Sequence, residues 1–244
     1  MVNTIPQTSS RDSPHLLYAG RVQEDFFKGL ALGARGLGFE HCEYLIGVPV
    51  AGRNWHFVMT NTFPKVLQER YRRHGFHEVD PTIEYAKTGV APLTWSNELF
   101  EQASLSALSR ELSGVGFNHG WTQPLRDSHG RFGALTLARS KGQVTREELR
   151  TKLPMMQWLA SVAHAMLFRE FLAKHQTECF AELTEREIAF LRLAAEGKTA
   201  GEIAAELGVV ERTASFHISN AITKLGATNK THAVTLAMRR GLLD

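Results

Sequence analysis

The chain has 244 residues, a length typical of two domains, with 43% hydrophobic and 22% charged residues, as in globular proteins. A formal charge of +3 gives only weak support for nucleic-acid binding, and two cysteines, Cys42 and Cys179, argue against a disulfide framework and fit a reducing cytoplasm. The polar N-terminus is unlike a signal peptide and no apolar run is long enough to cross a bilayer, so we expect a cytoplasmic protein without membrane attachment.

Hydrophobic periodicity predicts helices and strands in alternation after a flexible arm at residues 1–15. Helices are expected at Val22–Leu37, Pro64–His74, Glu98–Leu112 and Thr145–Leu172, the last with a disturbance at Pro154. Strands are expected at His41–Val50, Trp55–Thr60, Leu93–Trp95, Asn118–Leu125 and Phe132–Arg139. This order predicts an α+β fold, with an N-terminal α/β/α sandwich around an antiparallel sheet.

Within this region, Phe63, Leu67 and Tyr71 recur at i, i+4 and i+8 and therefore share one helix face. A plain core stripe explains such a face as well as a binding wall does. Asp80 precedes Pro81, which fits an ordinary helix N-cap. The residues alone leave both alternatives open.

Residues 174–182 are predicted to be a linker, and residues 183–244 an all-α domain of four short helices. Thr184 with Glu187, and Thr199 with Glu202, have the T-x-x-E spacing of capping boxes. A helix at Ala200–Leu207 and a second at Val210–Leu225 have helix-turn-helix spacing. The second has an apolar seam at Ala214, Ile218, Ala221 and Leu225, opposite a small-polar face that suits a DNA major groove.

The blocks LTERE, EGKT…EIA and ERTASFHISNAITKLG in this stretch resemble the LuxR-type, or GerE-like, helix-turn-helix. The resemblance implies contact with double-stranded DNA at a pseudo-palindromic operator, and a homodimer. The implied DNA-binding residues are Lys198, Thr199, Arg212, Thr213, Ser215, Phe216, Ser219, Asn220, Thr223 and Lys224. Val210 and Ser215 depart from the family, which usually has Ser or Thr and often Lys there. From Glu182 onward basic and acidic residues are equal in number, so a four-helix module that binds no DNA stays an alternative.

The run FPKVLQERYRRHGFHEVDPTIEYAKTG, with LTW at 93–95, NHGWTQPL at 118–125 and GALTLAR at 133–139, is similar to the autoinducer-binding domain of LuxR-type quorum-sensing regulators. This domain is expected to span residues 1–173 and to bind a small-molecule signal, an N-acyl-homoserine lactone, with no other cofactor. In the family an Asp accepts a hydrogen bond from the ligand amide, and that residue is Asp80 here. The implied ligand-binding residues are Phe63, Leu67, Tyr71, Asp80, Thr82, Trp95, Gly120 and Thr136.

Two departures affect the ligand. Leu67 stands where the family has a Trp that contacts the lactone, and Phe63 stands where it has a Tyr. Each change removes a hydrogen-bond donor, at a cost of about 0.5–1.5 kcal/mol net. A lactone, another small signal, or no ligand at all therefore remain open.

Two other functions compete with a ligand-responsive regulator. A response regulator would share the helix-turn-helix, but the N-terminal region lacks the acidic cluster, phosphorylatable Asp and late Lys of a receiver domain. A hydrolase or acyltransferase could use Cys42 with His41, or Asp80 with a histidine, but the sequence has no G-x-S-x-G, no H-E-x-x-H and no Gly-rich phosphate loop. We therefore expect no enzymatic activity.

Overall fold

The computed structural model describes residues 16–18, 24–49, 55–127, 131–169, 183–239 and 241–243. Within them, the first part of the chain forms a six-stranded sheet in the order β1-β3-β2-β6-β5-β4. The strands are β1 (Leu16–Tyr18), β2 (His41–Pro49), β3 (Trp55–Asn61), β4 (Leu93–Ser96), β5 (His119–Arg126) and β6 (Phe132–Arg139). The expected strands are confirmed to within one residue at each end, and β1 is an addition to them.

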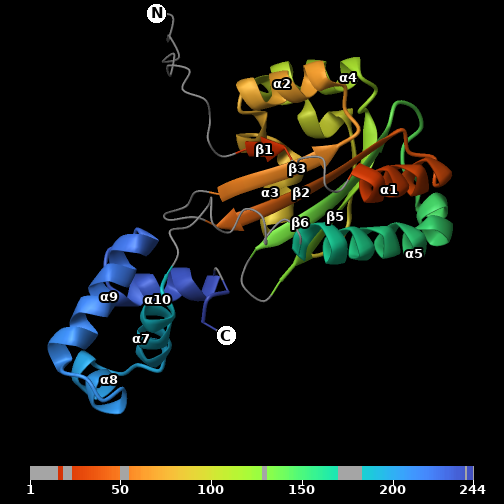
Figure 1. The fold of residues 1–244 in the computed structure, drawn as a ribbon. Coiled ribbons are helices and arrows are strands. Elements are labelled where there is room, and N and C mark those ends of the chain that lie inside the picture. The colour runs from red at the N-terminus through yellow and green to blue at the C-terminus, as the bar shows by residue number, and fades with distance from the viewer. Residues whose placement is uncertain are drawn as a thin grey trace, which may run out of the picture. The chain divides into compact units, whose positions relative to one another are not determined.

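Helices cover both faces of this sheet (Figure 1). α1 (Glu24–Gly36) and α5 (Arg146–Ala163) lie on one face, and α2 (Lys65–Arg73) and α4 (Ser106–Gly114) on the other. α1 and α5 pack closely, because a Cβ added at Gly33 would lie 3.1 Å from the side chain of Leu159. The α/β/α sandwich around an antiparallel sheet is therefore confirmed.

One expected helix is broken. In place of a single helix at Glu98–Leu112, the chain forms two 3₁₀ turns, η3 (Asn97–Phe100) and η4 (Ala103–Leu105), and then α4. Phe100 and Leu105 are both buried, yet residues five apart point in directions about 140° apart on an α-helix. An extended Gln102 lets both side chains reach the core.

Two further differences concern α3 and α5. α3 (Pro81–Thr88) begins directly after Asp80 and adds a helix to the expected order. The disturbance expected at Pro154 is wrong in position, because α5 runs through Pro154 and changes to a π-helical turn, η5 (His164–Phe168). This turn buries Leu167 and Phe168 and leaves Met166 exposed. The expected linker at 174–182 lies outside the described residues.

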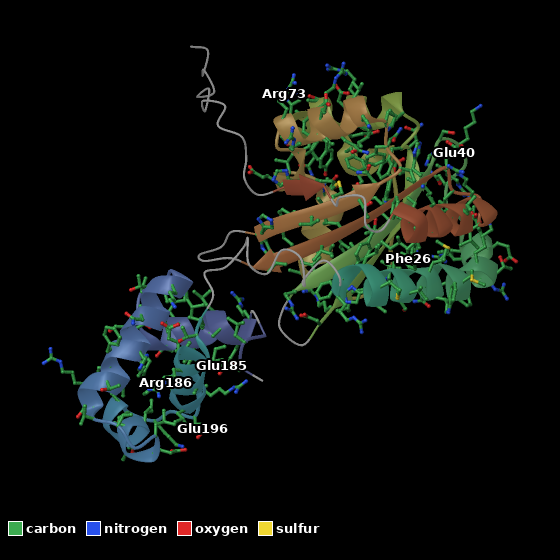
Figure 2. All side chains as sticks on the ribbon, in the orientation of Figure 1. Phe26, Glu40, Arg73, Glu185, Arg186 and Glu196 are labelled. Atoms are coloured by element: carbon green, nitrogen blue, oxygen red, sulfur yellow. The ribbon has the colours of Figure 1, made fainter. Side chains whose placement is uncertain are left out.

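The C-terminal part forms α7 (Glu185–Ala195), α8 (Ala200–Glu206), α9 (Glu211–Leu225) and α10 (Lys230–Arg239). Both capping boxes are confirmed. The apolar seam of α9 is also confirmed, since all four of its residues are buried against α7, α8 and α10. Figure 2 shows Glu185, Arg186 and Glu196, three charged residues of α7 and its C-terminal end.

Across the described ranges, no helix has both the length and the apolar character that a bilayer crossing needs. The same residues contain no group of three or more His, Cys, Asp or Glu side chains placed to hold a metal ion.

Candidate ligand pocket and nucleic-acid interface

Asp80 is the polar centre of the candidate pocket, and it is only 5% exposed. Its Oδ1 accepts hydrogen bonds from the backbone N–H of Thr82 at 2.8 Å and from the Thr82 hydroxyl at 2.6 Å. Its Oδ2 accepts one from the Tyr71 hydroxyl at 2.8 Å. Because each carboxylate oxygen can accept two hydrogen bonds, Oδ2 has capacity for one more donor.

Asp80 is thus an N-cap and a buried anchor at once. Its side chain caps α3, where Pro81 occupies the first turn, so the local sequence fixes its position. Burial raises the pKa of the Asp80 carboxyl above its ordinary value, and Thr82, Tyr71 and the backbone N–H of Ile83 act in the opposite direction. These donors favour the ionised form, which a ligand N–H also requires.

The helix face predicted from the sequence is buried. Phe63, Leu67 and Tyr71 are between 2% and 5% exposed, the first just before α2 and the other two on it. The Phe63 ring lies 5.2 Å from the ring of Phe117 in an edge-on contact, and 5.9 Å from His41. This wall is therefore aromatic and apolar where the family resemblance places donors.

Trp95 forms the opposite part of the site, on β4. It pairs with Gly120 of β5, where an added Cβ would lie only 2.2 Å from the Trp95 ring, so glycine makes room for the indole. The Trp95 N–H donates to the Thr122 hydroxyl at 3.0 Å, and the hydroxyls of Thr122 and Thr136 are also 3.0 Å apart. Trp95 packs against Phe117, with ring centroids 4.9 Å apart and the ring planes tilted by 31°.

The structure therefore brings all eight expected ligand-binding residues into the sheet domain. Phe63 and Leu67 form the apolar wall, and the other six form two groups. Tyr71 and Thr82 surround Asp80, while Gly120 and Thr136 lie with Trp95 and Thr122 on β4, β5 and β6. The strongest donors of both groups, the Tyr71 hydroxyl and the Trp95 indole, donate to protein acceptors. The site is consequently poor in donors toward a ligand.

Glu43 and Thr122 were missed by the sequence reasoning. Glu43 lies on β2, is 6% exposed, and is close enough to Asp80 for the two charges to interact. A charged residue inside the apolar run CEYLIGV was a signal that could have revealed it. Thr122 follows Gly120 by two residues on β5, so the two-residue period of a strand could have placed both on one face.

A surface groove of about 330 Å³ lies outside the aromatic wall, between α2 and α4. Its lining includes Leu67 and Val115. Arg70 of α2 and Glu111 of α4, which also line it, form an ion pair at 3.1 Å. Leu67 therefore separates this groove from the interior beside Phe63.

The nucleic-acid candidate is the outer face of α9. Its exposed residues recur at i, i+3, i+4, i+7 and i+11 and therefore lie along one side of the helix; they are Arg212, Ser215, Phe216, Ser219 and Thr223. Thr213 and Asn220 are half-buried beside them. Val210 at the N-cap makes no side-chain cap bond, as expected, although Glu211 supplies a negative charge in the first turn. The face is continuous and nearly neutral except for Arg212.

The three flanking residues expected to contact phosphates also have structural partners. Lys198 forms ion pairs with Glu196 and Glu206. Thr199 caps α8. Lys224 donates a hydrogen bond to the Glu187 carboxylate at 2.8 Å. Burial alone would raise the pKa of Glu187, but the hydrogen bonds from Lys224 and Thr184 hold this pKa below its ordinary value. Lys224 thus ties α9 to α7.

Comparison with known proteins matches two families to successive parts of the chain. Residues 23–167 match the family described as "Autoinducer binding domain", and residues 181–237 match "Bacterial regulatory proteins, luxR family". The transcriptional activator protein AnoR of Acinetobacter nosocomialis is 34% identical over 91% of this chain and 93% of its own length. The transcriptional activator protein SolR of Ralstonia nicotianae is 34% identical over 96% of this chain and 98% of its own.

Among solved structures, SdiA of Escherichia coli superposes with a TM-score of 0.68 and 25% identity, covering 92% of this chain and 93% of its own. A second SdiA structure, in complex with octanoyl-rac-glycerol, gives a TM-score of 0.67 over 92% of this chain and 91% of its own. Both likenesses extend over the sheet region and the helical region together.

Proposed function

This chain belongs to the LuxR-type quorum-sensing transcription regulators, which have an autoinducer-binding domain and a DNA-binding domain. We propose that it is a cytoplasmic homodimer. In this proposal, an acyl signal bound near Asp80 controls the binding of α9 to an operator. The domains of this proposal span residues 1–173 and 183–244, joined by a linker at 174–182. Its relatives are transcriptional regulators, and we infer that the chain itself catalyses no reaction.

The buried carboxylate of Asp80 carries the ligand proposal. A ligand N–H directed at Oδ2 would complete the hydrogen bonding of a group that the fold already buries and holds with three donors. An N-acyl-homoserine lactone has one such N–H, next to an acyl chain that suits apolar surroundings. The proposed contacts are therefore Asp80, Thr82 and Tyr71 toward the amide, with Phe63, Leu67, Trp95, Gly120 and Thr136 as the wall.

Asp80→Ala tests this assignment. Loss of the acceptor would leave the ligand N–H unpaired, at a cost of roughly 1–3 kcal/mol, or about five- to 150-fold in signal concentration. The measurement is the dose response of a reporter in cells given N-octanoyl-homoserine lactone. Asp80→Asn is the matched control for the fold, because Asn caps a helix as well as Asp does. An Asp80→Ala protein with the parent's dose response would show that Asp80 is a cap alone.

A signal without a lactone ring is the second candidate. The observation that favours it is the donor-poor wall, in which Phe63 and Leu67 cannot donate to a lactone carbonyl. The SdiA complex contains octanoyl-rac-glycerol, which is an acyl ester with hydroxyl groups and has neither amide nor lactone. Mass spectrometry of small molecules extracted from folded protein, purified from its native host, decides between the two candidates.

The DNA-binding proposal rests on the exposed face of α9. Arg212, Ser215, Phe216, Ser219 and Thr223 project from one side, and Asn220 and Thr213 flank them. We assign base contacts to this face and phosphate contacts to Lys198, Thr199 and Lys224 at its margins. Since Lys198 and Lys224 already pair with carboxylates, they would contact phosphates by sharing or exchanging these partners.

The homodimer is proposed from a stripe on α5 and η5. Met155, Trp158 and Met166 are 51%, 59% and 56% exposed and lie on one side of this helical segment. Met238 of α10 is also 53% exposed. A pseudo-palindromic operator needs two copies of α9, so a second chain is the natural cover for these surfaces.

Trp158→Glu should convert this dimer to a monomer, because a charge would enter an apolar interface. Light scattering with and without signal gives the mass directly. Leu32→Glu is the matched control, since Leu32 of α1 is 62% exposed and lies outside the stripe. A parent chain that is monomeric with signal and DNA present would contradict the dimer, and a dimeric Trp158→Glu protein would contradict this interface.

A further inference from the structure

Glu43 is a buried carboxyl that the proposed ligand contacts do not use. Side chains alternate between the two faces of β2. The ring of His41, two residues earlier, contacts Phe63 and Phe117, so His41 and Glu43 face the interior that these rings line. Cys42 points to the opposite face. Glu43 thus belongs to the same interior as the aromatic wall.

The surroundings of Glu43 contrast with those of Asp80. Asp80 accepts three hydrogen bonds from Thr82 and Tyr71. Glu43 has only the weaker influence of Asn61, at the end of β3, whose side-chain amide nitrogen makes no hydrogen bond to any acceptor among the described residues. Two ionised carboxylates side by side in an apolar interior repel each other. The better-bonded Asp80 therefore holds the negative charge, and Glu43 holds the proton.

On the basis of the proposed signal site, we propose that Glu43 is a second polar anchor of the pocket and donates a hydrogen bond from its carboxylic acid to a carbonyl oxygen of the bound signal. This donor takes the place of those that Phe63 and Leu67 lack. A protonated carboxyl has one O–H donor, which a Leu or an ionised Glu does not have.

The electrostatics agree with this geometry. Burial, together with the charge of Asp80, raises the pKa of Glu43 from 4.5 to about 8, while Asn61 acts in the opposite direction. The carboxyl is therefore mostly neutral near pH 7. A buried acid kept neutral so that it can donate is an established device of enzyme oxyanion sites.

The pair also defines the chemistry of the signal. Asp80 Oδ2 requires a donor, an N–H or an O–H, and Glu43 requires a carbonyl. An N-acyl amide or an acyl ester with a free hydroxyl meets both requirements, whereas a plain fatty acid or alcohol meets only part of them. The site therefore selects neutral acyl conjugates rather than the lactone ring as such.

Glu43→Leu and Glu43→Gln separate the donor from the volume of the side chain. The probes are N-octanoyl-homoserine lactone and octanoyl-rac-glycerol, titrated calorimetrically into the full chain near neutral pH. We expect Glu43→Leu to bind roughly five- to 100-fold more weakly, because a buried ligand carbonyl is left unpaired. Glu43→Gln should stay within a few-fold of the parent, since its amide still donates.

A second readout tests the proton itself. The titratable groups around Glu43 are Asp80 at the start of α3, Tyr71 of α2 bound to it, and His41 and Cys42 on its own strand. Between pH 4.5 and about 8 the folded parent keeps a proton that the unfolded chain releases, so stability falls as pH rises through this window. Both variants should lack the part of the pH dependence of stability that the Glu43 proton causes. Near pH 8, they should therefore be more stable than the parent.

The outcomes separate the two proposals. Equal affinity of the parent and a folded Glu43→Leu protein for a probe would overturn the role of Glu43 alone. A stability slope unchanged in Glu43→Gln would also overturn it, because Glu43 would then not hold the proton. Binding of neither probe by the parent would contradict the proposed acyl signal, and this inference with it. A merely structural Glu43 would alter stability and leave both affinities unchanged.

Discussion

Replacing Arg212 and Asn220 together by Ala should reduce operator affinity by roughly 30-fold or more, while the protein stays folded. Each side chain that contacts a base edge contributes about 1–3 kcal/mol, so the loss of two corresponds to roughly 2–6 kcal/mol. Neither residue belongs to the buried seam of α9, which consists of Ala214, Ile218, Ala221 and Leu225. The measurement is a gel-shift titration on DNA selected by the parent protein from a random pool.

Two control variants locate the effect. Arg186→Ala removes the same charge from an exposed position on α7 and should change affinity only a few-fold. Lys224→Met leaves Glu187 buried without its cation and also removes an assigned phosphate contact. It should therefore lower the melting temperature and weaken binding to all DNA sequences alike, whereas the double variant should lose affinity for the selected DNA without a change in melting temperature. If the double variant kept the parent's affinity and melting temperature, the reading face would have to be assigned to another helix.

The DNA-binding half could be predicted closely because its signals are local. T-x-x-E boxes mark helix starts, Gly226 takes a left-handed conformation at the end of α9, and a 3.6-residue period defines its seam. The ion pair between Glu187 and Lys224 could not be predicted in this way. These residues are 37 positions apart, and only the packing of α7 on α9 brings them together.

In the sheet domain, strands followed from alternation, but the sites did not. The break at Gln102 exists because the tertiary core takes up both Phe100 and Leu105, which one continuous helix could not direct to the same side. Local sequence periodicity does not show that both must be buried. Glu43 shows the same limit for function. Its spacing from Asp80 along the chain carries no information, since β2 and α3 meet only through the fold.

The burial of both carboxyls is costly for the fold, because an apolar pair of similar shape would avoid their desolvation. Sites that bind ligands often retain such locally unfavourable groups, and stabilising them reduces function. In this chain the cost is reduced by the hydrogen bonds to Asp80 and by the proton on Glu43. The same two features leave one acceptor and one donor for a signal.

Restoring the family's donors with Phe63→Tyr and Leu67→Trp should therefore sharpen the response to acyl-homoserine lactones. Each added bond contributes about 0.5–1.5 kcal/mol net, and more where a ligand carbonyl was unpaired, so we expect roughly a ten- to 100-fold lower half-maximal lactone concentration in a reporter assay. The increase in melting temperature on adding the same lactones should also be larger in the double variant, because a ligand that binds only the folded state stabilises it.

The larger Trp is the risk in this design, since overpacking a closed wall costs about 1–3 kcal/mol. Leu67 borders the 330 Å³ groove between α2 and α4, so part of the indole could be accommodated on that side. Val66→Trp adds the same ring at a position on α2 that is 60% exposed and should leave the lactone response unchanged. A double variant that folds, melts like the parent and gains nothing from any lactone would mean that Phe63 and Leu67 only fill the core. The selectivity of the pocket would then have to come from Asp80 and Glu43.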